Sequence, residues 1–167
     1  MVSETYVECL VARKPSFIMR LLKTILMMLT AVFVLIGVLF FPALIIALVF
    51  GAAAYFVYLN ADIEYEYLYL DKEISIDKVM AKSRRKKAAV YSVEQMEILA
   101  PIQSHRLDSY RNNPNMKKTV DYSSGVAEMP DKRYMMVCEN GVKVILEPSI
   151  ELIKAVALIA PRKVFMD

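Results

Sequence analysis

A long uncharged segment near the N-terminus limits what this chain can fold into. From Thr24 to Leu59 no residue carries a charge, and most side chains in this range are apolar. A single straight helix of that length would be about 54 Å long, whereas the hydrocarbon core of a bilayer is about 30 Å thick. Two membrane-spanning helices therefore fit the segment better than one.

Pro42 marks the expected break between the two helices, because proline suits the first turn of a helix and destabilises its interior. We expect helices at about 17–40 and 42–59, which together form a transmembrane hairpin over 17–59. A cleavable signal peptide is disfavoured, since the apolar run is too long and follows a polar stretch. The turn lacks polar residues, so a re-entrant hairpin that does not cross the bilayer fully is the alternative.

Basic residues flank this hairpin on both sides. Those before it are Arg13, Lys14, Arg20 and Lys23. The run Arg84–Lys87 follows it, somewhat farther away, while acidic residues such as Asp62 count little for orientation. Because basic flanks stay in the cytoplasm, we expect a multi-pass protein of the cell membrane with both termini cytoplasmic, including an N-terminal segment at 1–16.

Small residues recur every four positions along the second helix, at Ala43, Ala47 and Gly51. Such a stripe allows another helix to approach closely. The favoured interpretation is packing against the first helix, around Thr30 and Gly37. The alternative is a homo-oligomer formed through the second helix.

The remaining chain, 62–167, has the pattern of a small cytoplasmic β domain. Asn140-Gly141 lies between two β-rich runs, which is a strong hairpin signal because both positions of such a turn favour positive φ. The strands are expected at 63–70, 73–79, 88–92, 95–99, 118–123, 134–139 and 142–147. An apolar period of 3.6 residues then predicts a C-terminal helix at 149–160, with Ser149 as its N-cap.

The expected fold class is thus α+β. An N-terminal transmembrane helical hairpin is followed by a small antiparallel β domain with a C-terminal α-helix. The order of elements suits a pleckstrin-homology-like (PH-like) barrel or an open sheet, although layout alone does not settle function.

A basic run between two expected strands is the most conspicuous polar feature. It contains Lys82, Arg84, Arg85, Lys86 and Lys87. Anionic lipid head groups near a membrane attract such residues, so contact with lipid head groups is one hypothesis. The simpler interpretation is a solvated connection that pairs with the acidic hairpin at 62–77. The run lacks interleaved aromatic residues, which disfavours nucleic acid as a partner.

Residues suited to catalysis or metal binding are sparse. His105 is the only histidine and lies near Ser104 and Asp108, but a triad is assembled by fold geometry and not by adjacency in sequence. Cys9 and Cys138 are far apart and form no zinc-ligand spacing. We therefore predict no catalytic residue, no metal and no cofactor, and an enzyme acting on a membrane substrate is the least favoured alternative.

Several stretches resemble a family of short bacterial membrane proteins to which no activity is assigned. They are TYVECLVARK at 5–14, the hairpin, DIEYEYLYLDKEISIDKVMAKSRRKK at 62–87, MEILAP at 96–101, VDYSSG at 120–125 and APRKVF at 160–165. The resemblance spans nearly the whole chain. It implies a two-helix anchor with a cytoplasmic PH-like β domain, and no site residue.

The sequence therefore predicts a membrane-anchored cytoplasmic binding or scaffolding module. Its expected partners are the bilayer and an unidentified protein, with anionic lipids as a further candidate. A PH-like domain that senses anionic lipids is the alternative function.

Overall fold

The computed structural model describes residues 6–127 and 131–166. The chain divides into two compact units, a helical unit and a β domain. The helical unit comprises Lys14–Ile63 and Val79–Arg84. The β domain comprises the described residues of Met1–Arg13, Glu64–Lys78 and Arg85–Asp167.

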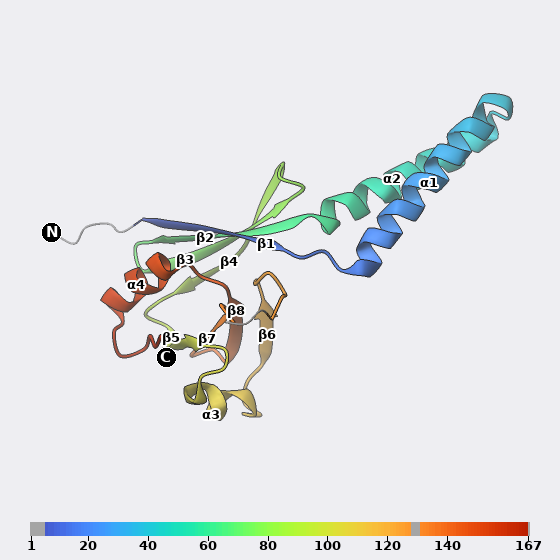
Figure 1. Cartoon of the computed structure of the whole chain (residues 1–167). Coiled ribbons are helices and arrows are strands. Elements are labelled where there is room, and N and C mark those ends of the chain that lie inside the picture. The colour runs from blue at the N-terminus through green and yellow to red at the C-terminus, as the bar shows by residue number, and fades with distance from the viewer. Residues whose placement is uncertain (1–5, 128–130, 167) are drawn as a thin grey trace. The chain divides into compact units, whose positions relative to one another are not determined.

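The helical unit is a hairpin of two long helices, α1 (Phe17–Leu39) and α2 (Pro42–Ala61), which lie side by side (Figure 1). Ser16 caps α1 by accepting a hydrogen bond from the backbone N–H of Met19 at 3.2 Å. Pro42 occupies the first turn of α2, where its missing N–H costs no helical hydrogen bond. The helix boundaries match those predicted from the sequence to within two residues.

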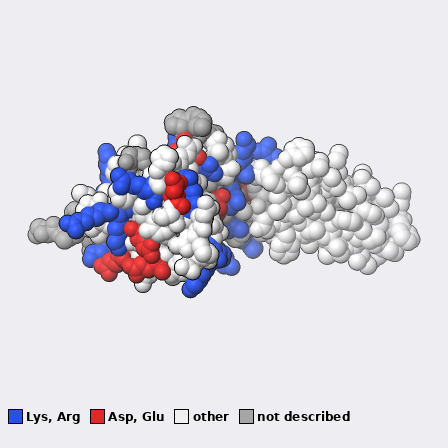
Figure 2. Space-filling model, turned by 90° about the horizontal axis from the view of Figure 1, so that it is seen from below, with Lys and Arg blue, Asp and Glu red and all other residues white. Residues whose placement is uncertain are grey.

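Both helices are long and apolar enough to cross a membrane. At 1.5 Å per residue, α1 is about 35 Å long and α2 about 30 Å, close to the thickness of the hydrocarbon core. Their outer side chains are exposed, as at Leu39, which is 92% exposed. Figure 2 shows no charged residue over most of the hairpin on the face drawn, whereas charged residues cover the β domain. Such an apolar surface is stable in lipid and not in water.

The β domain contains two four-stranded sheets. The first has the strand order β1-β2-β3-β4, with neighbouring strands hydrogen-bonded. Its strands are β1 (Val7–Arg13), β2 (Ile63–Leu70), β3 (Glu73–Met80) and β4 (Arg84–Ser92). β4 begins at Arg84, four residues before the predicted start, because the basic run is itself extended.

β1 was not predicted from the sequence, which indicated only a cytoplasmic segment at 1–16. Its side chains alternate between half-buried and exposed along VECLVAR, but the run is short and lacks turn residues that would mark it as a strand. In the structure β1 is the neighbour of β2 in the first sheet. The helical hairpin is therefore an insertion between two adjacent strands of one sheet.

The second sheet has the order β5-β7-β8-β6. Its strands are β5 (Met96–Pro101), β6 (Lys118–Asp121), β7 (Tyr134–Cys138) and β8 (Val142–Leu146). β7 pairs antiparallel with β5 and β8, while β6 pairs parallel with β8, so the sheet is mixed. Between β5 and β6 lie a 3₁₀ turn (His105–Leu107) and the short helix α3 (Asp108–Arg111).

The β7–β8 turn differs in detail from the prediction. Gly141 has a positive φ of 79°, whereas Asn140 does not belong to the residues with positive φ. Asn140 instead accepts a hydrogen bond from the backbone N–H of Val142 through its side-chain Oδ1 at 3.1 Å. The hairpin forms where the Asn-Gly pair predicted it, but by a side-chain-stabilised turn with only one left-handed residue.

Two tyrosines of β2 join the sheets in the core. Tyr67 is fully buried, and its hydroxyl donates to the carbonyl O of Tyr122 at 2.6 Å. Tyr65 packs edge-on against the ring of Tyr122, with ring centroids 5.3 Å apart. The C-terminal helix α4 (Ile150–Ile159) buries Leu152 and Val156 and packs on β1.

Candidate functional site

A groove of about 530 Å³ lies where the end of α4 meets the β2–β3 turn and the segment before β5. Pro161 follows α4 and stops it, because proline cannot continue the helical hydrogen bonds. The chain then runs beside β5, where the backbone N–H of Leu99 donates to the carbonyl O of Lys163 at 2.8 Å. On the other side, the N–H of Val93 donates to the carbonyl O of Lys72 at 2.8 Å.

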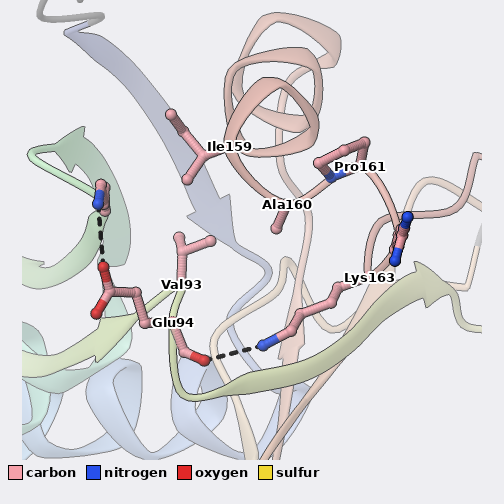
Figure 3. A pocket seen from close by; sticks show the side chains of 8 residues that line it. Val93, Glu94, Ile159, Ala160, Pro161 and Lys163 are labelled. Atoms are coloured by element: carbon pink, nitrogen blue, oxygen red, sulfur yellow. Dashed lines mark hydrogen bonds and ion pairs between the residues drawn. The ribbon is translucent and has the colours of Figure 1, made fainter.

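Positive charge dominates this groove (Figure 3). Lys72, Arg162 and Lys163 line it, and Glu94 is the acidic residue among the lining side chains. The Glu94 carboxylate lies 3.0 Å from the Lys72 ammonium, and the backbone carbonyl of Glu94 accepts from Lys163 Nζ at 2.9 Å. The groove thus carries about two positive charges in excess at neutral pH, counting ordinary side-chain charges.

The groove residues were not singled out from the sequence. They come from three segments that the fold brings together, and each segment alone looks like an ordinary turn or terminus. Asp71-Lys72 lies between the strands predicted at 63–70 and 73–79, and APRKVF at 160–165 contributed to the family resemblance. Neither signal indicates that Lys72 and Lys163 both contact Glu94.

The structure divides the predicted basic run between different surroundings. Lys82 lies in the β3–β4 turn with a positive φ of 53°, and Arg84 lies over the Tyr55 ring at 5.9 Å within the helical unit. Arg85 instead pairs with Glu66 in the β domain, while Lys86 and Lys87 are exposed on β4. Because side chains alternate along a strand, the five residues do not share one face.

Arg85 belongs to a partly buried ionic cluster on the first sheet. Its Nη2 donates to Glu66 Oε1 at 2.9 Å and lies 2.7 Å from Oε2, and Glu66 is only 2% exposed. Burial raises the pKa of Glu66, and a hydrogen bond with Glu8 raises it further. The same shared hydrogen bond, with a second from Tyr6, lowers the pKa of Glu8. The pKa values of the two carboxyls therefore move apart, so Glu66 takes up a proton at a higher pH than Glu8 does.

The predicted small-residue stripe of α2 faces α1. Ala43 and Ala47 are each 4% exposed, and a Cβ placed on Gly51 would lie 3.5 Å from Thr30 Cγ2. Gly37 of α1 is in closer contact still, since a Cβ there would lie 2.4 Å from Leu44 Cδ2. The structure thus brings these positions together inside the hairpin.

The other polar residues considered from the sequence lie apart from the groove. His105 Nδ1 is 3.3 Å from Asp108 Oδ2, with the imidazole fully exposed, and the Ser104 hydroxyl accepts from the N–H of Arg106. Burial raises the pKa of the Cys138 thiol to about 11, which disfavours the reactive thiolate. Within residues 6–127 and 131–166, no group of three or more His, Cys, Asp or Glu could hold a metal ion.

Two small sheets, a C-terminal helix and two apolar helices inserted between the first strands fit a PH-like protein with a hairpin of two candidate membrane helices. The family described as Bacterial PH-like domain (DUF6106) matches residues 3–166, so the chain belongs to this family. This match confirms the resemblance and the fold class predicted from the sequence. Comparison with curated proteins and with solved structures gives no match.

Proposed function

We propose that this protein is a membrane-anchored binding module whose PH-like domain lies in the cytoplasm and contacts another protein. The observation that carries the proposal is the insertion of the hairpin between β1 and β2, neighbours in one sheet. The domain cannot separate from its anchor without losing a strand, because the chain enters and leaves the hairpin through the same sheet. Permanent residence at the membrane suits a protein that recruits or positions a partner.

The insertion also bears on the orientation. β1 precedes the hairpin and β2 to α4 follow it, yet all belong to one folded domain. This arrangement supports the proposal that both ends of the hairpin emerge on the same side of the bilayer. Basic residues lie on both flanks, with Lys23 over the Tyr58 ring at 4.6 Å and Arg84 over Tyr55. Basic flanks favour the cytoplasm.

The groove chemistry supports binding more than catalysis. Its charged groups are ammonium, guanidinium and one carboxylate that already pairs with Lys72. Catalysis of a hydrolytic or transfer reaction usually needs a nucleophile beside a base, or an acid with a shifted pKa, inside a pocket. Cationic side chains around an apolar wall are instead suited to holding an acidic ligand.

Contact with anionic lipid is a second candidate, favoured by one observation. Lys23 and Arg84 each lie over a tyrosine of the last turns of α2, Tyr58 and Tyr55. Tyrosines and basic residues gather at the level of lipid head groups, where about 1 kcal/mol per basic residue is gained from anionic lipid. In this version Lys23 and Arg84 contact the head groups, while Arg85 remains paired with Glu66.

Labelling of single cysteines tests the orientation. In a variant with Cys9 and Cys138 replaced by alanine, we would introduce Tyr6→Cys, Arg162→Cys or Phe40→Cys. A membrane-impermeant maleimide should label the first two only in inverted vesicles, and the third only in intact cells if the hairpin crosses fully. Labelling of Tyr6→Cys and Arg162→Cys from opposite sides would contradict a single folded domain.

Crosslinking in intact membranes tests the binding role. A photoreactive amino acid would be placed at exposed positions of the β domain, including Arg162, Lys87 and Lys154. A partner should give a discrete adduct from at least one face and not from the others. Absence of discrete adducts from every face would reject the binding role.

A further inference from the structure

The groove beside the end of α4 has walls that are fixed before any ligand arrives. The hydrogen bond from the backbone N–H of Val93 to the carbonyl O of Lys72 holds the β2–β3 turn. The hydrogen bond from the N–H of Leu99 to the carbonyl O of Lys163 holds the chain after α4. A further bond runs from the N–H of Phe165 to the carbonyl O of Leu99 at 2.8 Å. Because these segments are already ordered, a ligand would lose little affinity to ordering them.

The positive charges in the groove are only partly neutralised. Glu94 offers its carboxylate to Lys72 and only an uncharged backbone carbonyl to Lys163. Arg162 forms no ion pair with any residue that the structure describes. Two cations at the rim therefore remain available to an anionic group, and a guanidinium can bind a carboxylate through two hydrogen bonds.

Apolar side chains form the other wall. Val93, Ile159, Ala160 and Pro161 line the groove. Val93 is only 1% exposed, so the accessible apolar surface comes from Ile159, which is 40% exposed, and from Ala160 and Pro161. Figure 3 shows Ile159 and Val93 lying toward each other, with the Glu94–Lys163 contact next to Val93 on the same segment. A hollow with an apolar wall and a cationic rim suits a ligand that carries both an aliphatic group and carboxylates.

Lys72 occupies a backbone position that glycine would fill more easily. Its φ is +64° and that of Asp71 is +50°, so both turn residues are left-handed without being glycine. A side chain at such a position costs backbone energy, and strained positions of this kind gather at functional sites. The lysine at this position places its ammonium against Glu94 in the groove.

We infer that the groove binds an acidic peptide segment of a partner protein, with an aliphatic side chain against Ile159 and Pro161 and carboxylates at Arg162 and Lys163. The inference rests on the proposed function and names the partner's chemistry. A peptide fits better than a lipid head group because the hollow offers an apolar wall of side-chain size beside its cations. A head group would use the charges alone.

Fluorescence anisotropy of the full-length protein in an uncharged detergent tests the inference. The probe is a fluorescein-labelled peptide of sequence Glu-Asp-Glu-Leu-Asp-Glu. Matched probes carry serine in place of leucine, or glutamine and asparagine in place of the acidic residues. We expect the acidic leucine peptide to bind more tightly than either matched probe, and its affinity to fall as salt is raised.

Two variants and one control then locate the site. Arg162→Glu should weaken binding roughly tenfold at low salt, since it replaces an attraction by a repulsion. Ile159→Ser should weaken the leucine peptide but not the serine probe. Lys154→Glu makes the same charge change on an exposed position of α4 outside the groove, and it should alter the affinity by less than about twofold.

Three results would overturn the inference. The first is that the peptide does not bind at concentrations up to about 1 mM. The second is that Arg162→Glu and Ile159→Ser leave peptide binding unchanged. The third is that short-chain phosphatidylglycerol binds in the groove and the peptide does not. If photocrosslinked adducts form only at Lys87 and the peptide does not bind the groove, this inference is rejected and the proposed function is retained. Absence of adducts at every position would reject both.

Discussion

The hydroxyl of Tyr67 donates a 2.6 Å hydrogen bond to the carbonyl O of Tyr122, a residue that lies beyond the end of β6 in the other sheet region. The same hydroxyl accepts from the backbone N–H of Glu147 at 3.3 Å, just after β8. One buried side chain of β2 therefore satisfies two backbone groups that no strand partner reaches. Tyr67 connects the sheets by polar bonds as well as by packing.

Tyr67→Phe should therefore destabilise the β domain by about 1–3 kcal/mol, because a partly buried carbonyl and N–H lose their partner while the ring stays in place. Thermal unfolding of the full-length protein in detergent, followed by the circular-dichroism signal of its β-sheets, measures the change. Tyr6→Phe is the control, since Tyr6 is 58% exposed and its hydroxyl bonds only Glu8. Equal effects of the two substitutions would contradict the role given to Tyr67.

The hairpin offers a matched pair of glycines. An alanine at Gly37 would place its Cβ 2.4 Å from Leu44 Cδ2 and 3.2 Å from the Leu44 backbone N, whereas at Gly51 the nearest atom is 3.5 Å away. Gly37→Ala should lower the thermal stability of the hairpin by about 1–3 kcal/mol through overpacking. Gly51→Ala should leave it unchanged or raise it, because alanine favours the helix.

A second substitution shows whether the cause is this clash. Leu44→Ala removes the side chain that an alanine at position 37 would meet, so the double variant should recover much of the loss seen for Gly37→Ala. Additive losses in the double variant would show that close contact with Leu44 is not the cause. The readout is resistance of the protein in detergent to heat, measured for all four proteins.

Much of the fold followed from local patterns in the sequence. The uncharged run and Pro42 predicted the helix pair, the alternation in IEYEYLYL predicted β2, and Ser149 marked the start of the last helix. Each of these signals lies within the element that it predicts. β1 was missed because its pairing partner follows the hairpin, so its strand character depends on a contact that no short window contains.

The candidate site was harder to predict for the same reason. Lys72, Glu94 and Lys163 meet only after the β2–β3 turn, the segment before β5 and the chain after α4 have folded together. The basic run, by contrast, is obvious in sequence but is divided by strand alternation and by the ion pair of Arg85. A run of charged residues in the sequence therefore need not form one site. Charged residues that lie far apart in the sequence can form one.

The Glu8–Glu66 pair predicts a pH dependence of stability. The pKa of Glu66 is raised in the folded protein, chiefly by burial. At a pH between the ordinary glutamate pKa and this raised pKa, the folded protein holds a proton on Glu66 that the unfolded chain has lost. Stability from Glu66 should rise as the pH falls from neutral toward the ordinary glutamate range. Glu8 acts in the opposite direction, but only below that range, because its pKa is lowered.

Glu66→Gln should remove this rise, since an amide at position 66 cannot titrate. As the pH is lowered from about 7 to about 5, the melting temperature of the wild-type protein should increase relative to that of the variant. Glu139→Gln removes an exposed carboxyl elsewhere and should keep the wild-type slope. Equal slopes for Glu66→Gln and the wild-type protein would contradict a raised pKa of Glu66. Two other charged groups face Glu66: Arg85 lowers its pKa, whereas Asp77 raises it.

Replacing Lys72 should raise the stability of the folded protein and weaken its binding of the acidic peptide. Lys72→Gly creates an Asp-Gly turn, relieves a left-handed side chain and removes an exposed ion pair, so a net gain of up to about 1 kcal/mol is expected. Ala81→Gly relieves the same kind of strain, at a φ of 48°, in the β3–β4 turn, which does not line the groove. Both variants should melt at a higher temperature than the wild-type protein, but only Lys72→Gly should weaken the acidic peptide. A Lys72→Gly protein that is more stable and binds the peptide unchanged would show that the strained lysine serves no ligand.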